Sequence, residues 1–331
     1  MRNITVFLVL VIIINCAQFA SAQEEQTKAY TFSTSTSFGM FYGQAKEIVY
    51  ASSNYKSNIL SQLLWNIKPV FYYSLSLDFS RAQPMDKWGF FSTLSLKNGI
   101  PGKSGIHENR DWMSIENTAL THYSIHDNIT NELFFFDASA GLSFPLGKSL
   151  LLKTYIAMSY MRFSFTGQKG QGTYARETGG LYSGIFAPID DDPEYVSFDN
   201  WEKVINYTQR WIIGTPGISL AYHSPRRFFT ELFFNISPLI SCEDLDEHLT
   251  NSKVFRDYMR GGIFLEPGFH FVYLIGERLE LSMDFSWRYI TRTRGETWYG
   301  RGIGTANFVQ QGEAGAGLSV FNTGLSLKIR L

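Results

Sequence analysis

Strict alternation of apolar and polar residues, with charges on the polar side, constrains this chain more than any other sequence feature. Residues 279–289 carry Asp284 and Arg288 on a polar face, and the opposite face holds Leu279, Leu281, Met283, Phe285, Trp287 and Tyr289. A period of two indicates β-strands whose two faces meet different surroundings. A water-filled lumen accepts charged side chains, whereas the core between two packed sheets does not. The pattern therefore favours a transmembrane barrel over a soluble sandwich.

The same alternation recurs along the chain and predicts the number of strands. We expect ten, at about 29–46, 58–79, 87–98, 131–144, 150–165, 206–223, 227–242, 261–274, 279–291 and 315–331. Long polar connections fall at about 99–130, 166–205, 243–260 and 292–314, and they alternate with tight turns. Short turns on one side and long loops on the other are typical of outer-membrane barrels. The prediction is an all-β, ten-stranded antiparallel transmembrane β-barrel with long extracellular loops.

Composition argues against two other classes of protein. Lys and Arg together number 29 and Asp and Glu 30, a formal net charge of −1, so the basic excess typical of nucleic-acid-binding proteins is missing. The mean hydropathy is −0.10, and beyond the N-terminal segment no apolar run approaches the length of a membrane helix. We therefore expect no nucleic-acid partner and no helical bundle in the membrane.

The N-terminus has the features of a secretory signal peptide. Arg2 precedes an apolar run over 4–14, and Ala20-Ser21-Ala22 forms a cleavage site of the A-x-A type. We predict a signal peptide at 1–22 and a single mature domain at 23–331, located in the cell outer membrane. An alternative interpretation takes 13–16 as a loose lipobox with an acylated Cys16, although the preceding asparagine fits that motif poorly.

Two arginines share the parity of residues expected to face lipid. Arg162 lies on the face of Met158, and Arg210 lies on the face of Ile212. Both flank the loop expected at 166–205, which places them near the outer interface, where a lipid-facing Arg costs about 0–1 kcal/mol instead of roughly 2–4 at the midplane. They either extend toward the headgroups or bind an anionic lipid headgroup, because the planar guanidinium fits phosphate well.

An acidic run at 243–248 contains an arrangement suited to acid–base chemistry. Asp244, Asp246 and His248 are two residues apart, so an extended chain projects them to one side. An Asp beside a His can orient the imidazole and stabilise its protonated form. The face that carries Ile240 is expected to meet lipid, so a bulge near 241–243 is needed if these groups serve a lumen site. The alternative is an acidic loop in solvent.

No motif predicts a metal site or a covalent nucleophile. The run from His107 to Asp111 differs from the H-E-x-x-H zinc motif, because an Asp stands where the second His belongs. His122 and His126 lie four residues apart, but in an expected loop this spacing has no helical meaning. Ser124 lies near His126 without a G-x-S-x-G motif around it.

Seven short segments in collinear order resemble motifs of the omptin family of outer-membrane aspartate/histidine endopeptidases. They are Lys46-Glu47-Ile48-Val49-Tyr50, Ser61-Gln62-Leu63-Leu64-Trp65, Asp111-Trp112-Met113, Ser124-Ile125-His126, Arg162-Phe163-Ser164-Phe165-Thr166, Tyr207-Thr208-Gln209-Arg210 and Asp244-Leu245-Asp246-Glu247-His248. The resemblance spans nearly the whole mature chain. It implies a ten-stranded barrel with its active site in the extracellular mouth. Family members cut peptides, often between two basic residues, with a water molecule held between an aspartate pair and an Asp-His dyad.

The resemblance also implies a role for individual catalytic residues. Asp246 and His248 match the dyad, and Asp111 matches one member of the aspartate pair. The other member is Asn109 in this chain, which can position water but supplies no negative charge. Glu108 is a candidate substitute if the loop shifts.

The remaining matches concern binding. Glu47 and Asp244 match acidic residues that hold the basic side chain of the substrate, and Arg162 and Arg210 match basic members of a lipid A site. An acidic member of that site is replaced, with Tyr160 near its place. The implied partners are peptides or proteins with basic residues and outer-membrane lipid. We expect a monomer without cofactors, with lipopolysaccharide as a candidate activator.

A second class of function uses the same barrel. If Asn109 has weakened hydrolysis, the chain is an adhesin or a receptor for cationic ligands. A passive pore is a weaker alternative, because ten strands enclose a narrow interior.

Overall fold

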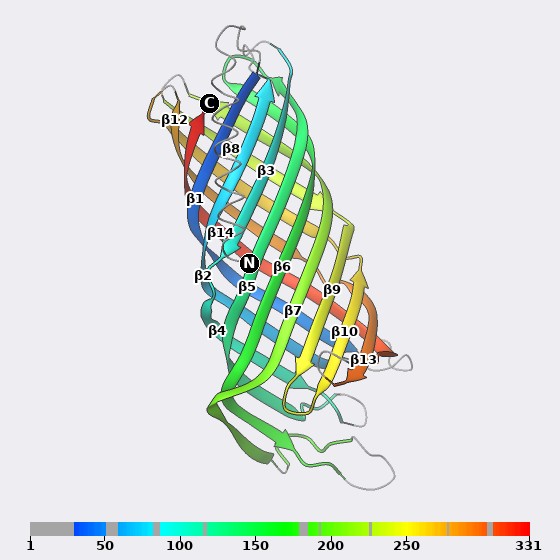
Figure 1. Ribbon diagram of the computed structural model, residues 1–331. Helices are drawn as coiled ribbons and strands as arrows, with labels where there is room; N and C mark the ends of the chain where they lie inside the picture. The colour runs from blue at the N-terminus through cyan, green and yellow to red at the C-terminus, as the bar shows by residue number, and fades with distance from the viewer. Residues whose placement is uncertain are drawn as a thin grey trace.

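The computed structural model describes residues 30–50, 59–81, 87–114, 118–178, 185–191, 193–224, 227–276, 278–302 and 307–331, and they form one antiparallel sheet closed into a barrel (Figure 1). Its strand segments are β1 (Tyr30–Tyr50), β2 (Ile59–Arg81), β3 (Gly89–Gly99), β4 (Gly102–Asp111), β5 (His122–Pro145), β6 (Leu150–Ala175), β7 (Pro193–His223), β8 (Phe228–Ser237), β9 (Leu239–His248), β10 (Lys253–Arg260), β11 (Phe264–Leu274), β12 (Leu279–Ile290), β13 (Arg294–Arg301) and β14 (Val309–Arg330). The expected signal peptide and Cys16 lie outside the described residues. Among the residues described, no helix is long and apolar enough to cross a membrane.

The pairing of first and last strands closes the barrel. β1 pairs with β2 along one edge and with β14 along the other, and every pairing between them around the sheet is antiparallel. The predicted all-β antiparallel barrel is therefore confirmed as a class. The described residues form fourteen segments where ten strands were expected. The additional segments β4, β9, β10 and β13 continue β3, β8, β11 and β12 alongside the same neighbouring strands, and they lie wholly or partly in ranges expected to be loops.

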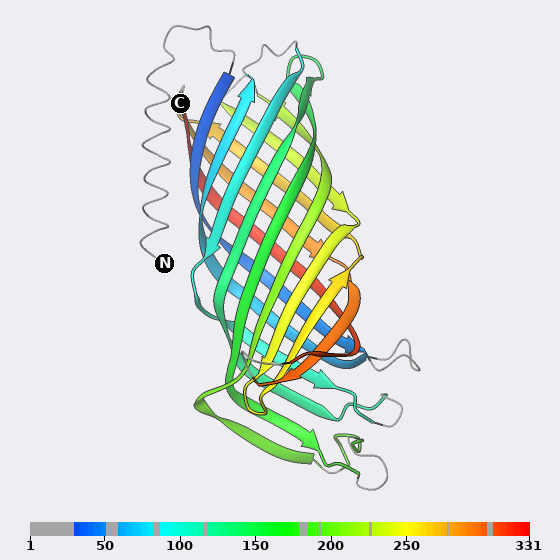
Figure 2. The ribbon, with the colours of Figure 1, turned by 45° about the vertical axis from the view of Figure 1, so that its right-hand side comes forward.

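The strands continue well past the apolar part of the barrel at one end. β6 and β7 also run into the expected loop at 166–205, and together they reach furthest at this end (Figures 1 and 2). These extensions mix polar and apolar residues on both faces, so they carry no regular apolar alternation that would identify them as strands. They build a wall beyond the belt described next. From here on, above means toward this end of the barrel, which lies at the bottom of Figures 1 and 2.

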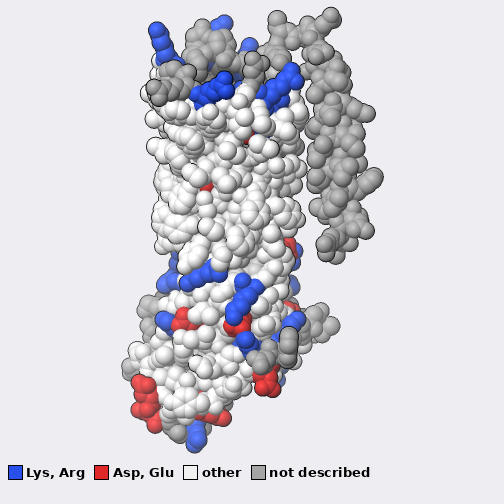
Figure 3. Space-filling view, turned by 90° about the vertical axis from the view of Figure 1, so that its left-hand side faces the viewer, with Lys and Arg blue, Asp and Glu red and all other residues white. Residues whose placement is uncertain are grey.

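A belt of apolar side chains surrounds the middle of the barrel. Ile156, Ile218, Leu232, Met283 and Leu325 are all exposed on its outer surface. Charged side chains gather at the two ends, and few occur in the belt on the face shown in Figure 3. An apolar band between charged ends is the surface that a bilayer requires of a spanning barrel.

The interior of the belt is polar and ion-paired. Arg288 contacts Glu266 at 2.7 Å and Asp137 at 3.0 Å, and Lys153 contacts Glu231 at 2.7 Å. Each buried carboxylate in this lower lumen thus meets a cation close by, which compensates for its removal from bulk water. The charged faces read from the sequence lie inside the barrel, as predicted.

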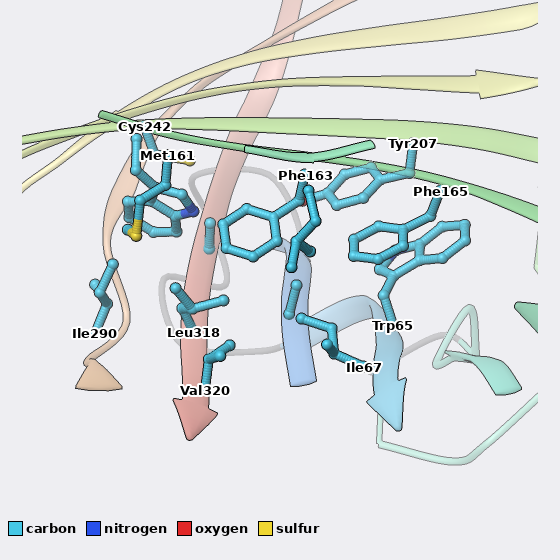
Figure 4. Packing of buried hydrophobic residues seen from close by; sticks show 14 of the residues in the cluster. Trp65, Ile67, Met161, Phe163, Phe165, Tyr207, Cys242, Ile290, Leu318 and Val320 are labelled. Carbon is cyan, nitrogen blue, oxygen red and sulfur yellow. The ribbon is translucent and has the colours of Figure 1, made fainter. Parts of the chain in front are cut away.

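Aromatic residues fill the barrel above this lumen. Along β1, Phe41 belongs to this core, and Ser35 and Ser37 before it line the lower lumen. Trp65 is fully buried, and its ring stacks on Tyr207 at 5.2 Å between centroids and on Phe165 at 5.6 Å (Figure 4). This packed layer separates the lumen below from a second cavity above.

A bend at Pro238 and Leu239 reverses the parity of one strand. In β8 the even-numbered Leu232 and Ile236 are exposed, whereas in β9 Leu239 is exposed and Ile240 is buried. Two consecutive residues face outward at the bend, so every later even-numbered residue faces inward. The expectation that Ile240 faces lipid was wrong, and the required irregularity lies before the predicted position at 241–243.

Candidate functional site

A cavity of about 850 Å³ lies at the end of the barrel where the strands outrun the apolar belt. Side chains from opposite walls line it, among them Glu47 on β1, Ser61 on β2, Asp111 on β4 and His248 on β9. These residues are far apart in sequence, and the inward parity of their strands brings them together. Residues 107–111 and 243–248, which the sequence placed in loops, are strand residues here.

Asp246 and His248 form a hydrogen-bonded pair on β9. Asp246 Oδ2 lies 2.8 Å from His248 Nε2, and both side chains face the cavity because of the bend at Pro238. The Phe255 ring meets the imidazole edge-on, with centroids 5.5 Å apart. Burial lowers the pKa of His248, but the nearby Asp246 and then Asp111 outweigh it, so the pKa is raised from its ordinary value. The imidazole is thus a strengthened base.

Asn109 and Asp111 lie on the opposite wall, next to each other on the inner face of β4. Ser61, directly across the β2–β4 ladder, donates to Asp111 Oδ1 at 2.6 Å, and Asn109 Nδ2 lies 3.3 Å from Asp111 Oδ2. Burial raises the pKa of Asp111, and the hydrogen bonds from Ser61 and Asn109 and the charge of His248 act against this. The pair offers one carboxyl and one amide to a molecule in the cavity.

Glu108 does not take the place of a second acid. It lies on the opposite face of β4 and accepts a hydrogen bond from Arg110 Nε at 2.8 Å. It is absent from the lining of the cavity, so the substitution by a shifted loop is not realised.

Glu47 and Asp244 lie deeper in the same end of the barrel, and each is 1% exposed. Tyr207 donates to Asp244 Oδ2 at 3.0 Å, and Gln209 in turn donates to Tyr207 Oη at 2.8 Å. Burial raises the pKa of Glu47 well above its ordinary value, and the charges of Asp246, Asp244 and Asp257 raise it further. The two acids predicted to hold a basic side chain are therefore brought together in a site that favours a cation.

The histidines of the loop expected at 99–130 are buried on strands. His126 Nε2 lies 3.1 Å from Ser124 Oγ, and its Nδ1 lies 2.6 Å from the carbonyl oxygen of Lys169. His107 stacks on Trp65 at 3.9 Å, and burial lowers its pKa well below the ordinary value. Among the described residues, no group of three or more His, Cys, Asp or Glu side chains is arranged to hold a metal ion.

Arg162 and Arg210 are cross-strand neighbours on the outer surface. They are paired in the β6–β7 ladder, just above the exposed Ile212, as the parity argument predicted. Each already has a carboxylate close by: Arg162 lies 3.1 Å from Glu132, and Arg210 lies 3.4 Å from Glu243. A phosphate bound here would share the guanidinium groups with these acids.

Sequence reasoning missed three contributors to the site. Ser61 was noted only as part of a motif, Tyr207 likewise, and Asp257 was assigned to a polar loop. Asp257 shares odd parity with Lys253 and Phe255, which line the cavity, and that alternation is its only sequence signal.

The fold and the cavity together define a class: a membrane-spanning β-barrel with an Asp-His pair and an Asn-Asp pair at one end of its interior. The family comparison is more specific. The sequence model of the omptin family matches residues 28–331, so this chain belongs to the omptin family, as its motifs predicted, and is an outer-membrane β-barrel.

A solved structure shares this fold. Outer membrane protease OmpT from Escherichia coli matches with a TM-score of 0.78 and 21% sequence identity, over 93% of this chain and 99% of that chain. The toluene transporter TodX of P. putida has a TM-score of 0.33 at 10% identity over 92% of this chain and 91% of its own, too distant to support an argument. No curated protein sequence matches this chain.

Proposed function

We propose that this protein is an outer-membrane endopeptidase that cleaves peptides at basic, and especially dibasic, sites, with its cavity facing the exterior. The proposal depends on one observation: the Asp246–His248 pair and the Asn109–Asp111 pair line the same cavity. Family membership and the fold shared with a bacterial outer-membrane protease support it.

In the proposed mechanism, a water molecule between the two pairs is the nucleophile. With Nε2 held by Asp246, His248 accepts a proton from this water through Nδ1, and the water oxygen attacks the peptide carbonyl. Asp111 and Asn109 hold the water from the other side. The tetrahedral intermediate collapses as the peptide C–N bond breaks, and the proton on His248 passes to the leaving amine. No covalent enzyme intermediate forms.

Specificity is proposed to come from the buried acids. Glu47 and Asp244 would bind the guanidinium or ammonium group of the substrate, because a carboxylate accepts charge-assisted hydrogen bonds from either. The direct test is refolded protein, lipopolysaccharide and a peptide that contains Arg-Arg. We expect cleavage at that pair and none in a peptide with Gln-Gln in its place. Equal cleavage of both peptides would contradict the specificity, and cleavage of neither would contradict the enzyme.

The outer arginines are proposed to bind a lipid A phosphate. Replacement of both Arg162 and Arg210 by Ala should weaken lipopolysaccharide binding by about tenfold or more, because charge-assisted hydrogen bonds are each worth about 1.5–3 kcal/mol. Binding of labelled lipopolysaccharide to protein in detergent measures this. An Arg301→Ala variant, which removes a fully exposed cation, is the control. Unchanged binding in the double variant would mean that the two arginines only extend toward the headgroups and bind no particular lipid.

Asn109 favours one alternative function, a receptor or adhesin for cationic ligands. With a single carboxyl in the pair, the site would bind basic peptides without turnover. The alternative predicts saturable peptide binding by the unchanged protein, no cleavage, and cleavage gained in an Asn109→Asp variant. Cleavage by the unchanged protein would rule it out.

A further inference from the structure

Asp257 is a buried acid that the proposed mechanism does not use. It lies on β10, directly across from Asp244 on β9 and from Thr297 on β13, and it is 0% exposed. Residues directly opposite in an antiparallel pair have Cβ atoms about 4.5–5.5 Å apart. Asp257 therefore belongs to the same cluster as Asp244 and Glu47.

The oxygens of this cluster have too few partners. Both carboxyl oxygens of Asp257, Oδ1 of Asp244 and Oε2 of Glu47 lack a well-aligned hydrogen-bond donor among the described residues; the carboxyl of Asp257 lies close enough to that of Asp244 to share a proton and is otherwise near only the hydroxyl of Thr297. No salt bridge within the described part of the chain involves any of the three acids. The lower lumen differs, because Asp137 and Glu266 share Arg288 there, at 3.0 and 2.7 Å. Unpartnered buried acids indicate a cation that arrives from outside.

The cavity leads to this cluster. Lys253 and Phe255, four and two residues before Asp257 on the inner face of β10, line it, and so do Glu47 and Thr297, the residue paired with Asp257. The titratable groups that face the cluster are Asp246 and Cys242 on β9 and Tyr207 on β7, with His248 and Lys253 nearer the mouth. A long basic side chain entering from the mouth would end among the three carboxyls.

We propose that Asp257 is a third acidic, specificity-determining residue of the subsite for the basic side chain, and that a guanidinium or ammonium group binds there in exchange for protons held by the three carboxyls. The inference deepens the proposed function and rests on it for the identity of the substrate. It adds a residue to the subsite and a coupling between substrate binding and proton release.

Electrostatics explains the exchange. Burial raises the pKa of Asp257 to about 7, and burial together with the charge of Asp257 raises the pKa of Asp244 well above its ordinary value. In an empty subsite the three close buried carboxyls therefore give up their protons less readily than carboxyls in water do. A bound cation favours their charged forms and lowers each pKa, so protons leave. The sign follows by linkage: binding of the cation strengthens as pH rises and weakens as pH falls.

The experiment measures binding without cleavage. An Arg-Arg peptide with a methylene group in place of the scissile carbonyl is titrated calorimetrically into refolded full-length protein with lipopolysaccharide, at pH 7, in two buffers of different ionisation enthalpy. We expect proton release by the unchanged protein. Asp257→Asn should bind about tenfold more weakly and release fewer protons, since a charge-assisted hydrogen bond is lost. Glu296→Gln, which alters an exposed acid beside Thr297, should behave like the unchanged protein.

Outcomes separate the inference from the proposed function. A second peptide with citrulline in place of the arginine should bind both proteins equally, without proton release, which shows that Asp257→Asn has a folded site. Unchanged affinity and unchanged proton release in Asp257→Asn would overturn the inference, even if the Arg-Arg peptide is cleaved. Proton-linked binding that Asp257→Asn weakens, in a protein that cleaves nothing, would support the inference and contradict the enzyme. No arginine binding by the unchanged protein would overturn both.

Discussion

A His248→Ala variant should lose about 10²–10⁴-fold in kcat on an Arg-Arg peptide, the range that general-base catalysis typically contributes. The imidazole is the group placed to accept a proton from water, and its Asp246 partner cannot replace it, because Asp246 is turned toward the position that the ring vacates. Substrate affinity should change little, since Glu47 and Asp244 are untouched. Steady-state kinetics with a fluorogenic peptide separates kcat from KM.

The control for this variant is another histidine at the far end of the barrel. His223 ends β7 on the side away from the cavity, and its ring stacks on Phe229, at 5.2 Å. His223→Ala should retain full activity. If the unchanged protein and the His248→Ala variant cleave the peptide equally fast, the assignment of the dyad is wrong.

An Asp111→Asn variant should lower kcat by about 10²-fold, the scale on which the loss of one preorganised electrostatic contact in an active site lowers catalysis. Asn109 already supplies an amide in this pair, so the substitution leaves two amides and no negative charge opposite His248. Ser61 can still donate to the oxygen that remains, which keeps the backbone and the side-chain position close to the original. A fall in kcat at nearly constant KM would assign the effect to the charge.

Glu108→Gln is the matched control, because it removes one carboxylate from the same strand on the opposite face. The substitution should lower the free energy of unfolding by no more than the ion pair with Arg110 contributes, about 0–1 kcal/mol, and should leave kcat unchanged. Loss of activity in both variants would point to a general effect of charge near β4, and full activity in Asp111→Asn would remove Asp111 from the mechanism.

Alternation in the sequence was sufficient to predict the belt and the lumen. An apolar face such as that of Leu281 and Met283 meets lipid because nothing else in the barrel can cover it, and the charged face of Arg288 finds partners inside. The outward position of Arg162 and Arg210 could be predicted from the alternation for the same reason. Motif resemblance grouped the residues of the cavity, because their order along the chain is shared with the family.

The strands of the wall above the belt could not be predicted from alternation or from motif resemblance. β4, β9, β10 and β13 stand above the belt with polar residues on both faces, so no apolar alternation separates a strand from a loop. The bond from Ser61 to Asp111 depends on the β2–β4 register, and Asp257 meets Asp244 only through the β9–β10 register. The register between two paired segments is not visible in the sequence of either segment alone, so these two contacts could not be predicted.

The bend at Pro238 and Leu239 means that chain length, as much as side-chain chemistry, determines whether the catalytic groups reach water. Removal of Ser241 alone, just after the bend, would rotate the rest of β9 by half a repeat, so that Asp244, Asp246 and His248 would point away from the barrel and Glu243 would turn inward. A deletion that changes no acidic residue and no histidine could thus abolish the enzyme. Insertion or deletion at this corner is therefore a simple way for related barrels to gain or lose a reactive interior.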